Sequence, residues 1–172
     1  MESKAKFLGH PIHPMLIVFP LGLLATAPIF DIIALVRGTP SLFIASFWMI
    51  AAGILGGVIA SVFGLIDWLA IPKGTRAKRI GLWHGAGNGL VIVLFAVSWF
   101  LRRPAPDQPT WSALAFSWFS VLIALVTAWL GGELVDRLGV GVDDGANLNA
   151  PNSISGRIAK QDDPHARVRR VA

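Results

Sequence analysis

Four long apolar stretches, separated by short polar segments, dominate the pattern along the chain. They run over residues 14–36, 42–71, 80–101 and 110–130, and the last continues with mixed composition to residue 139. A helix needs about 20 apolar residues to cross the hydrocarbon core of a bilayer. The pattern therefore predicts an all-α bundle of four transmembrane helices, with residues 1–139 as the membrane domain. No internal repeat is evident, although each successive pair of helices is expected to form a hairpin.

The remaining residues, 140–172, are rich in Gly, Asn, Asp and Ser and then become basic. Such a composition predicts a loop-rich, partly disordered tail. The chain as a whole is 54% hydrophobic and 15% charged, whereas soluble domains carry about 25% charged residues. Because there is no cysteine, disulfides and thiolate metal sites are excluded. The run that follows Lys4 and Lys6 resembles a signal peptide, but it stays apolar to Val36, which favours a retained helix.

The distribution of basic residues predicts the topology. One side of the predicted membrane domain carries Lys4, Lys6, Lys73, Arg76, Lys78 and Arg79 together with the tail, and the other carries Arg37, Arg102 and Arg103. Short cytoplasmic loops are enriched in Lys and Arg. We therefore expect a bacterial inner-membrane protein with both termini in the cytoplasm. The expected partner is the lipid bilayer, and the basic tail favours anionic lipid over nucleic acid.

Four antiparallel spans bring the unusual polar residues to one boundary layer. On the side of the termini this layer contains His10, His13, Asp67, His84, Asn88, Glu133 and Asp136. Asp31 is expected near the opposite side. Intramembrane carboxylates are either paired or functional, and Arg37 is close enough in sequence to neutralise Asp31.

Three chemical interpretations of this layer remain open. In the first, His13 and His84 are axial ligands of haem b, with Asn88 beside them, since helix bundles build cofactor sites from facing helices. In the second, His10, His13, Asp67 and His84 bind a divalent metal. In the third, the histidines and carboxylates handle protons. Gly85, Gly87 and Gly89, which surround His84, are expected to leave room for a flat macrocycle.

Structural interpretations of the same residues also remain open. His10 and His13 suit a turn before the first helix, and His84 suits packing beside Trp83. Asp67 is within reach of an arginine of the following loop, either Arg76 or Arg79. A stripe of small residues, formed by Gly53, Gly57, Ser61 and Gly64, predicts close helix–helix contact.

No phosphate-binding loop, nucleophile elbow or HExxH motif is present, so the sequence assigns no catalytic residue and leaves open whether the protein is an enzyme. Haem or metal binding for membrane electron transfer, with a redox partner or a homo-oligomer, is the first hypothesis. The second is a non-catalytic scaffold or assembly subunit that uses the glycine stripe and the tail. The third is a small proton- or ion-coupled transporter that uses Asp31 and Asp67.

Four segments carry a family resemblance: HPIHPMLIVFPLG at 10–22, GLIDW at 64–68, IPKGTRAKRIGLWHGAGN at 71–88 and GGELVDRLGVGVDDG at 131–145. Together they resemble the bacterial membrane family known as domain of unknown function 2231, over residues 7–155. The resemblance implies a four-helix inner-membrane protein without a settled activity. Fusion of family members to redox modules points toward electron transfer. The family pattern emphasises the positions of His10, His13, Asp67 and His84.

Overall fold

The computed structural model describes residues 1–155 and 157. Within them the chain forms a short antiparallel ribbon, four long helices and two short helical turns. The elements are β1 (Lys6–Phe7), β2 (His10–Pro11), α1 (Ile12–Arg37), α2 (Pro40–Ala70), α3 (Arg76–Arg102), α4 (Trp111–Gly132), the π-helical η1 (Glu133–Arg137) and the 3₁₀ turn η2 (Ser153–Ser155). All four long helices are long and apolar enough to cross a membrane. The predicted four-span membrane bundle is confirmed.

Local sequence signals define the helix ends. Gly38 adopts a left-handed conformation with φ 62° and ends α1, and Pro40 occupies the first turn of α2, where the missing N–H costs nothing. The side chains of Thr75 and Thr110 cap α3 and α4 by accepting hydrogen bonds from backbone N–H groups. Such caps satisfy donors that have no partner inside the helix.

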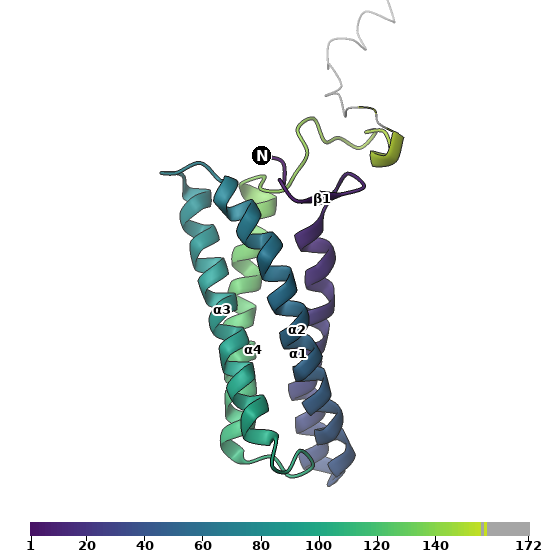
Figure 1. The fold of residues 1–172 in the computed structure, drawn as a ribbon, viewed down its shortest axis with the longest axis vertical. Coiled ribbons are helices and arrows are strands. Elements are labelled where there is room, and N and C mark those ends of the chain that lie inside the picture. The colour runs from purple at the N-terminus through teal and green to yellow at the C-terminus, as the bar shows by residue number, and fades with distance from the viewer. Residues whose placement is uncertain (156, 158–172) are drawn as a thin grey trace, which may run out of the picture.

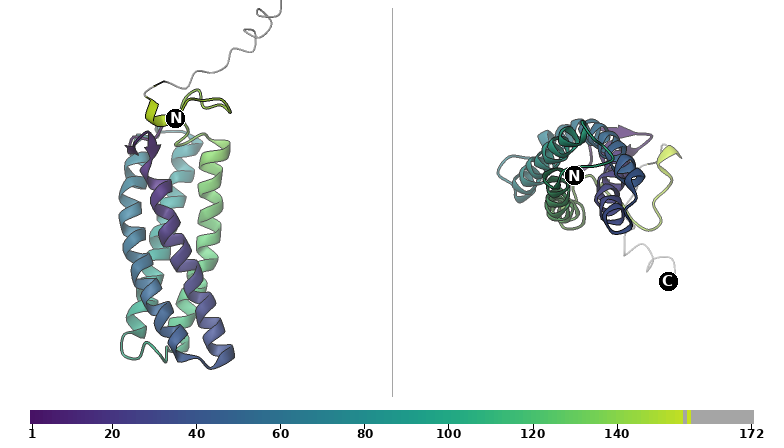
Figure 2. Two further views of the ribbon diagram at one scale, coloured as in Figure 1. Left: turned by 90° about the vertical axis from the view of Figure 1, so that its right-hand side faces the viewer. Right: turned by 90° about the horizontal axis from the view of Figure 1, so that it is seen from below.

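The bundle consists of two helical hairpins placed side by side. α1 packs along α2, and α3 packs along α4, whereas α2 touches α3 less and α1 touches α4 only slightly. Figure 1 shows the two pairs as separate halves, and the end-on view in Figure 2 shows the same division. The N-terminal segment, the α2–α3 loop and η1 lie at one end, which we call the terminus end. The α1–α2 and α3–α4 turns lie at the other, which we call the turn end.

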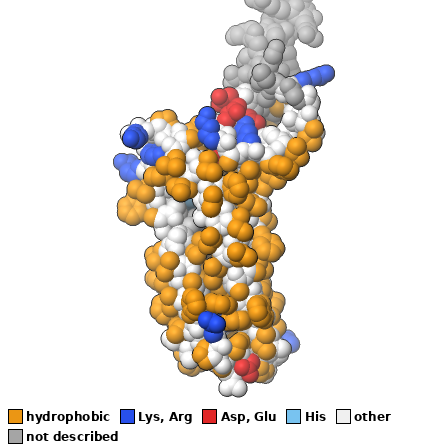
Figure 3. All heavy atoms as spheres, viewed as in Figure 1, with side chains coloured by type: hydrophobic (Ala, Val, Ile, Leu, Met, Phe, Trp, Pro, Cys, Tyr) orange, Lys and Arg blue, Asp and Glu red, His pale blue; other side chains and the backbone are white. Residues whose placement is uncertain are grey.

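The outer surface is apolar along the middle of the bundle. Val18, Leu55, Val93 and Leu125 are each more than half exposed, and Figure 3 shows charged side chains mainly near the two ends of the visible face. The interior core contains Leu24, Ala27, Ile50, Val91 and Phe95. A bilayer requires an apolar girdle between charged ends. Because the bundle has this surface, the protein is a membrane protein.

The glycine stripe of α2 serves contacts inside the chain. A Cβ on Gly53 would lie 2.6 Å from Leu24, and one on Gly57 would lie 3.2 Å from Ile92. One on Gly64 would lie 2.9 Å from the ring of His13. These glycines therefore let α1 and α3 approach α2, as the small-residue pattern predicts. Ser61, the fourth member of the predicted stripe, is exposed, and its hydroxyl donates to Val58 within α2.

Part of the segment that follows the bundle is attached to the terminus end. The Gly141 N–H donates to the Met1 carbonyl at 2.9 Å, and Asp143 forms an ion pair with Lys6. Residues 140–155 contain turns and η2. The predicted disorder of the rest of the tail concerns residue 156 and residues 158–172, which lie outside the described part.

Candidate functional site

His13 is the second residue of α1, and its ring lies against α2. The Nδ1–H group donates to the carbonyl oxygen of Ala60 at 2.9 Å. A carbonyl can only accept, so this hydrogen bond requires a proton on Nδ1, and a neutral ring then carries its lone pair on Nε2. Gly64, one turn beyond Ala60, provides the surface behind the ring, because any Cβ there would lie 2.9 Å from Cε1.

His84 has the same surroundings in the second hairpin. Its Nδ1–H group donates to the carbonyl of Thr127 at 2.8 Å, and a Cβ on Gly131 would lie 2.9 Å from its Cε1. Its Nε2 accepts a hydrogen bond of 3.2 Å from the amide of Asn88. The amide oxygen of Asn88 in turn accepts from the Thr127 hydroxyl at 2.8 Å. The Nε2 atom of His84 is therefore occupied by one long hydrogen bond from Asn88.

The two imidazoles approach each other across the interior of the bundle. Their ring centroids are 6.5 Å apart, and their planes are nearly perpendicular at 89°. His13 comes from the first hairpin and His84 from the second. The sequence predicts that the two rings share one membrane depth, and the structure shows that they also lie close together laterally.

The glycines around His84 differ in their surroundings. A Cβ on Gly85 or Gly89 would meet no atom within 4 Å. One on Gly87 would collide with the Thr127 side chain. Gly87 therefore allows close packing of α3 on α4, whereas Gly85 and Gly89 lie on the exposed surface of the bundle.

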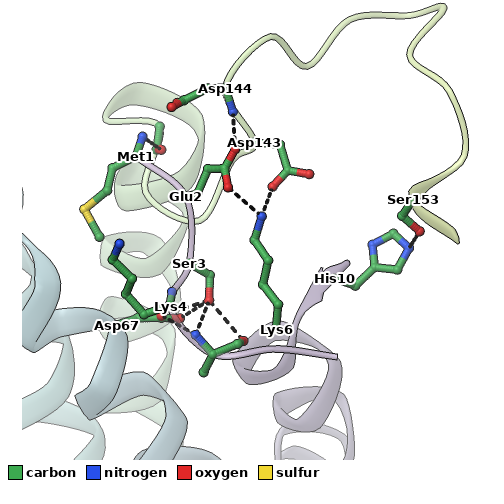
Figure 4. A network of polar contacts seen from close by, with 12 residues as sticks. Met1, Glu2, Ser3, Lys4, Lys6, His10, Asp67, Asp143, Asp144 and Ser153 are labelled. Atoms are coloured by element: carbon green, nitrogen blue, oxygen red, sulfur yellow. Dashed lines mark hydrogen bonds and ion pairs between the residues drawn. The ribbon is translucent and has the colours of Figure 1, made fainter. Parts of the chain in front are cut away.

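The other residues of the four-residue metal hypothesis lie in different surroundings (Figure 4). The Nε2 atom of His10 is 3.1 Å from the Ser153 hydroxyl. The Asp67 carboxylate accepts from the Ser3 hydroxyl at 2.8 Å and from the Lys4 N–H at 2.8 Å. In the part of the chain that the structure describes, no three His, Asp or Glu side chains form a group able to hold a metal ion.

Asp67 attaches the N-terminal segment to the end of α2. It does so in place of pairing with Arg76 or Arg79. Arg76 instead forms an ion pair of 2.6 Å with Glu133, which connects α3 to η1.

Exposed charges support the same segment. Lys6 contacts both Glu2, at 2.9 Å, and Asp143. Its hydrogen bond holds the pKa of the Glu2 carboxyl below its usual value. The hydrogen bond to Asp143 raises the pKa of the Lys6 ammonium. Both shifts favour the charged forms and therefore the docked segment.

A second polar cluster lies near the turn end, and sequence analysis did not identify its partners. Arg102 and Asp31 are both fully buried and form a two-pronged ion pair with distances of 2.8 and 2.7 Å. The remaining N–H groups of Arg102 donate to Ser46, Ser98 and Ser117 at 3.1–3.3 Å. All five donors of the guanidinium are thus used, and the cluster connects all four helices.

The sequence analysis ended the third span at residue 101 and counted Arg102 with the charges of the following loop. Its neighbour Arg103 is exposed, as that interpretation expects. The missed signal was the spacing Ser98–Arg102, which puts a hydroxyl one helical turn before the charge on one face. Asp31 therefore has an interior partner and does not depend on Arg37.

Comparisons with known proteins show the family to which the chain belongs, without a match to an individual protein. No curated protein and no solved structure matches it. The family model described as "Predicted membrane protein (DUF2231)" matches residues 9–144, a range that contains all four helices and both histidines of the pair. The chain belongs to this family of membrane proteins of unknown function.

Proposed function

We propose that the protein binds one haem b between its two hairpins, with His13 and His84 as axial ligands, and carries electrons within the membrane. The observation that supports this proposal is the pair of Nδ1-protonated imidazoles with centroids 6.5 Å apart. Imidazole nitrogens bind metals at about 2.0–2.1 Å, so two rings this close could hold one iron through their Nε2 atoms.

Hydrogen bonding prepares both rings for ligation. Histidine ligands generally donate their second ring N–H to a backbone carbonyl or carboxylate, which orients the ring and makes the other nitrogen more basic. Ala60 and Thr127 supply these carbonyls. The contact between Asn88 and His84 Nε2 must open on binding, and at 3.2 Å it is the weakest hydrogen bond of the group.

A macrocycle is favoured over a bare ion because, among the described residues, the pair His13 and His84 brings two imidazole nitrogens to the site rather than three or four ligands. Divalent ions such as zinc require about four ligands, and the described residues gather no group of three suitable side chains. A porphyrin brings four nitrogens of its own and needs two axial ligands from the protein. Haem held by two histidines supplies reversible one-electron chemistry without an open position for substrate. Electron transfer follows from that coordination.

The orientation in the membrane is part of the same proposal. Lys4, Lys73 and Arg79 are exposed at the terminus end, whereas buried Arg102 does not count as a loop charge at the turn end. The positive-inside rule then favours the bacterial inner membrane, with the terminus end and the histidine pair toward the cytoplasm.

Absorption spectroscopy tests the function directly. Protein produced with a haem precursor and purified in mild detergent is expected to show about one haem per chain and, on reduction, the sharp bands of six-coordinate low-spin iron. His13→Ala and His84→Ala should each abolish that spectrum, and His10→Ala, the matched control, should leave it unchanged. Wild-type protein that takes up no haem during production or on titration with haemin would refute the proposal. Equal spectra for all three variants would refute the assignment of ligands.

A further inference from the structure

The two hairpins bury the same positions. α2 buries Ser46, Phe47, Ile50, Gly53 and Ala60. A shift of 67 positions carries this set onto Ala113, Leu114, Ser117, Ser120 and Thr127, which are the buried residues of α4. The side chains differ, so sequence comparison does not reveal the correspondence, but the positions agree at every member of the set.

A similar correspondence links the first helix of each hairpin. A shift of 71 positions carries four of the six buried residues of α1, Pro20, Leu24, Ala27 and Asp31, onto four of the five buried residues of α3, Val91, Phe95, Ser98 and Arg102. Buried Pro28 falls on half-buried Trp99, and buried Ala34 falls beyond the end of α3. The two shifts differ by four residues, about one helical turn. Each hairpin thus presents the same face to the other.

The same shifts relate the histidine surroundings. His13 maps onto His84, the acceptor Ala60 onto Thr127, and Gly64 onto Gly131. The corresponding hydrogen bonds measure 2.9 and 2.8 Å. The corresponding glycine contacts are both 2.9 Å. Agreement of contacts as well as burial indicates a repeated structural unit rather than a coincidence of helix periodicity.

We infer that the membrane domain is two copies of one hairpin unit facing each other about an axis parallel to the helices. Asp31 and Arg102 occupy the same repeat position but carry opposite charges, and this difference specifies that each hairpin pairs with the other kind. Both hairpins begin at the terminus end (Figures 1 and 2), so a rotation about that axis exchanges them. The inner face of α1–α2 is therefore an interaction surface whose fitting partner is the inner face of α3–α4.

Charge makes this surface selective. Two α1–α2 hairpins facing each other would bury Asp31 against a second aspartate. Two α3–α4 hairpins would bury two arginines. Buried charges without opposite partners are strongly destabilising, and rejection of wrong partners by such clashes is a common source of specificity. When several copies of the chain meet in one membrane, like hairpins are prevented from pairing.

The hydroxyl groups around the ion pair show that the halves have become specialised. Ser46, Ser98 and Ser117 all accept from Arg102. Their repeat equivalents are Ala113, Ala27 and Ile50, which offer no side-chain acceptor. An arginine at position 31 would consequently find its carboxylate partner but none of the three hydroxyls.

Exchange of the charges in the full-length chain tests the inference. Asp31→Arg and Arg102→Asp alone place like charges together, and we expect less than a tenth of the wild-type yield of monodisperse protein. The double exchange should recover several-fold more than either. Adding Ala27→Ser, Ile50→Ser and Ala113→Ser should increase the recovery further. The matched control, Asp31→Arg with Arg103→Asp, moves the new carboxylate to the exposed neighbour and should recover nothing.

A circular permutant provides a second measurement that keeps every residue. In it, α3–α4 precedes α1–α2 through a linker at the terminus end, and equivalent units predict monodisperse protein in comparable yield. The inference is overturned if the serine-supplemented exchange recovers no more than the single variants, or if the permutant fails to fold. None of these readouts depends on haem, so their failure is distinguishable from failure of the proposed function.

Discussion

Two polar levels of the bundle differ in how completely their groups are paired: the Asp31–Arg102 level near the turn end and the histidine level, His13 and His84, near the terminus end. Near the turn end, Arg102 uses every donor, and both oxygens of Asp31 accept from it. Near the terminus end, His13 and His84 each use Nδ1, while Nε2 has one weak contact in His84 and no protein partner among the described residues in His13. A closed network stabilises and specifies a fold. Under the proposed function, the unpaired Nε2 atoms at the histidine level are the ones that bind the haem.

The largest expected loss of stability comes from breaking the Asp31–Arg102 ion pair. Arg102→Leu leaves the Asp31 carboxylate buried without a counter-charge, and we expect a loss of about 3–5 kcal/mol of stability. Thermal unfolding in detergent measures it. Arg103→Leu is the matched control, because Arg103 is exposed and its guanidinium lies over the rings of Trp99 and Phe100.

Replacing both partners sharpens the same test. An apolar pair of similar volume is often no less stable than the ion pair it replaces, so Asp31→Leu with Arg102→Leu should regain much of the loss. A double variant as unstable as Arg102→Leu would show that the serine hydroxyls, rather than the unpaired charge, dominate this level.

Substitutions at the histidine level should reduce the stability much less. His13→Ala and His84→Ala each remove one hydrogen bond to a backbone carbonyl, worth about 1 kcal/mol. The ligand-free protein should therefore keep most of its thermal stability in both variants. Losses as large as that of Arg102→Leu would mean that the histidines are primarily structural, which would remove the contrast between the two levels.

The glycines behind the rings provide a finer test. Gly64→Ala and Gly131→Ala place a Cβ 2.9 Å from an imidazole carbon, so the ring must shift by a few tenths of an ångström. We expect stability changes of about 1 kcal/mol, since overpacking costs about 1–3 kcal/mol and alanine favours the helix. In haem-loaded protein, a shifted ring should add high-spin character to the absorption spectrum. Gly85→Ala, which has open space around it, should not do so.

Sequence reasoning predicted the spans closely because membrane helices leave a strong apolar signal. It also predicted that His13 and His84 lie at one end of the bundle, where their rings are in fact close. It did not reveal their lateral approach, because depth follows from span count whereas rotation about each helix axis depends on packing. The pairing of Asp31 with Arg102 was missed for a related reason. The two residues belong to different hairpins, so the local Ser98–Arg102 spacing can indicate a satisfied arginine but not its carboxylate partner. The repeat is hidden because buried positions are shared while side chains are not.

The smallest expected effect on global stability concerns the N-terminal segment, which covers the terminus end and has no counterpart at the turn end. Asp67→Ala removes the acceptor of the Ser3 hydroxyl and the Lys4 N–H. We expect a local loss of about 1–2 kcal/mol with little change in global unfolding. Tryptic cleavage after Lys4 and Lys6, followed by mass spectrometry, should accelerate several-fold.

Acidification should weaken the same segment by a separate route. The pKa of Glu2 is lowered by its hydrogen bond to Lys6, so its contribution is present at neutral pH and is lost as pH falls through the folded-state pKa. Cleavage should therefore accelerate below about pH 4 in wild-type protein, measured with an acid-active protease, and Glu2→Gln should reduce that acceleration. Cleavage that is insensitive to both Asp67→Ala and acid would mean that the segment is held by the Met1–Gly139 and Met1–Gly141 backbone contacts, which neither change touches.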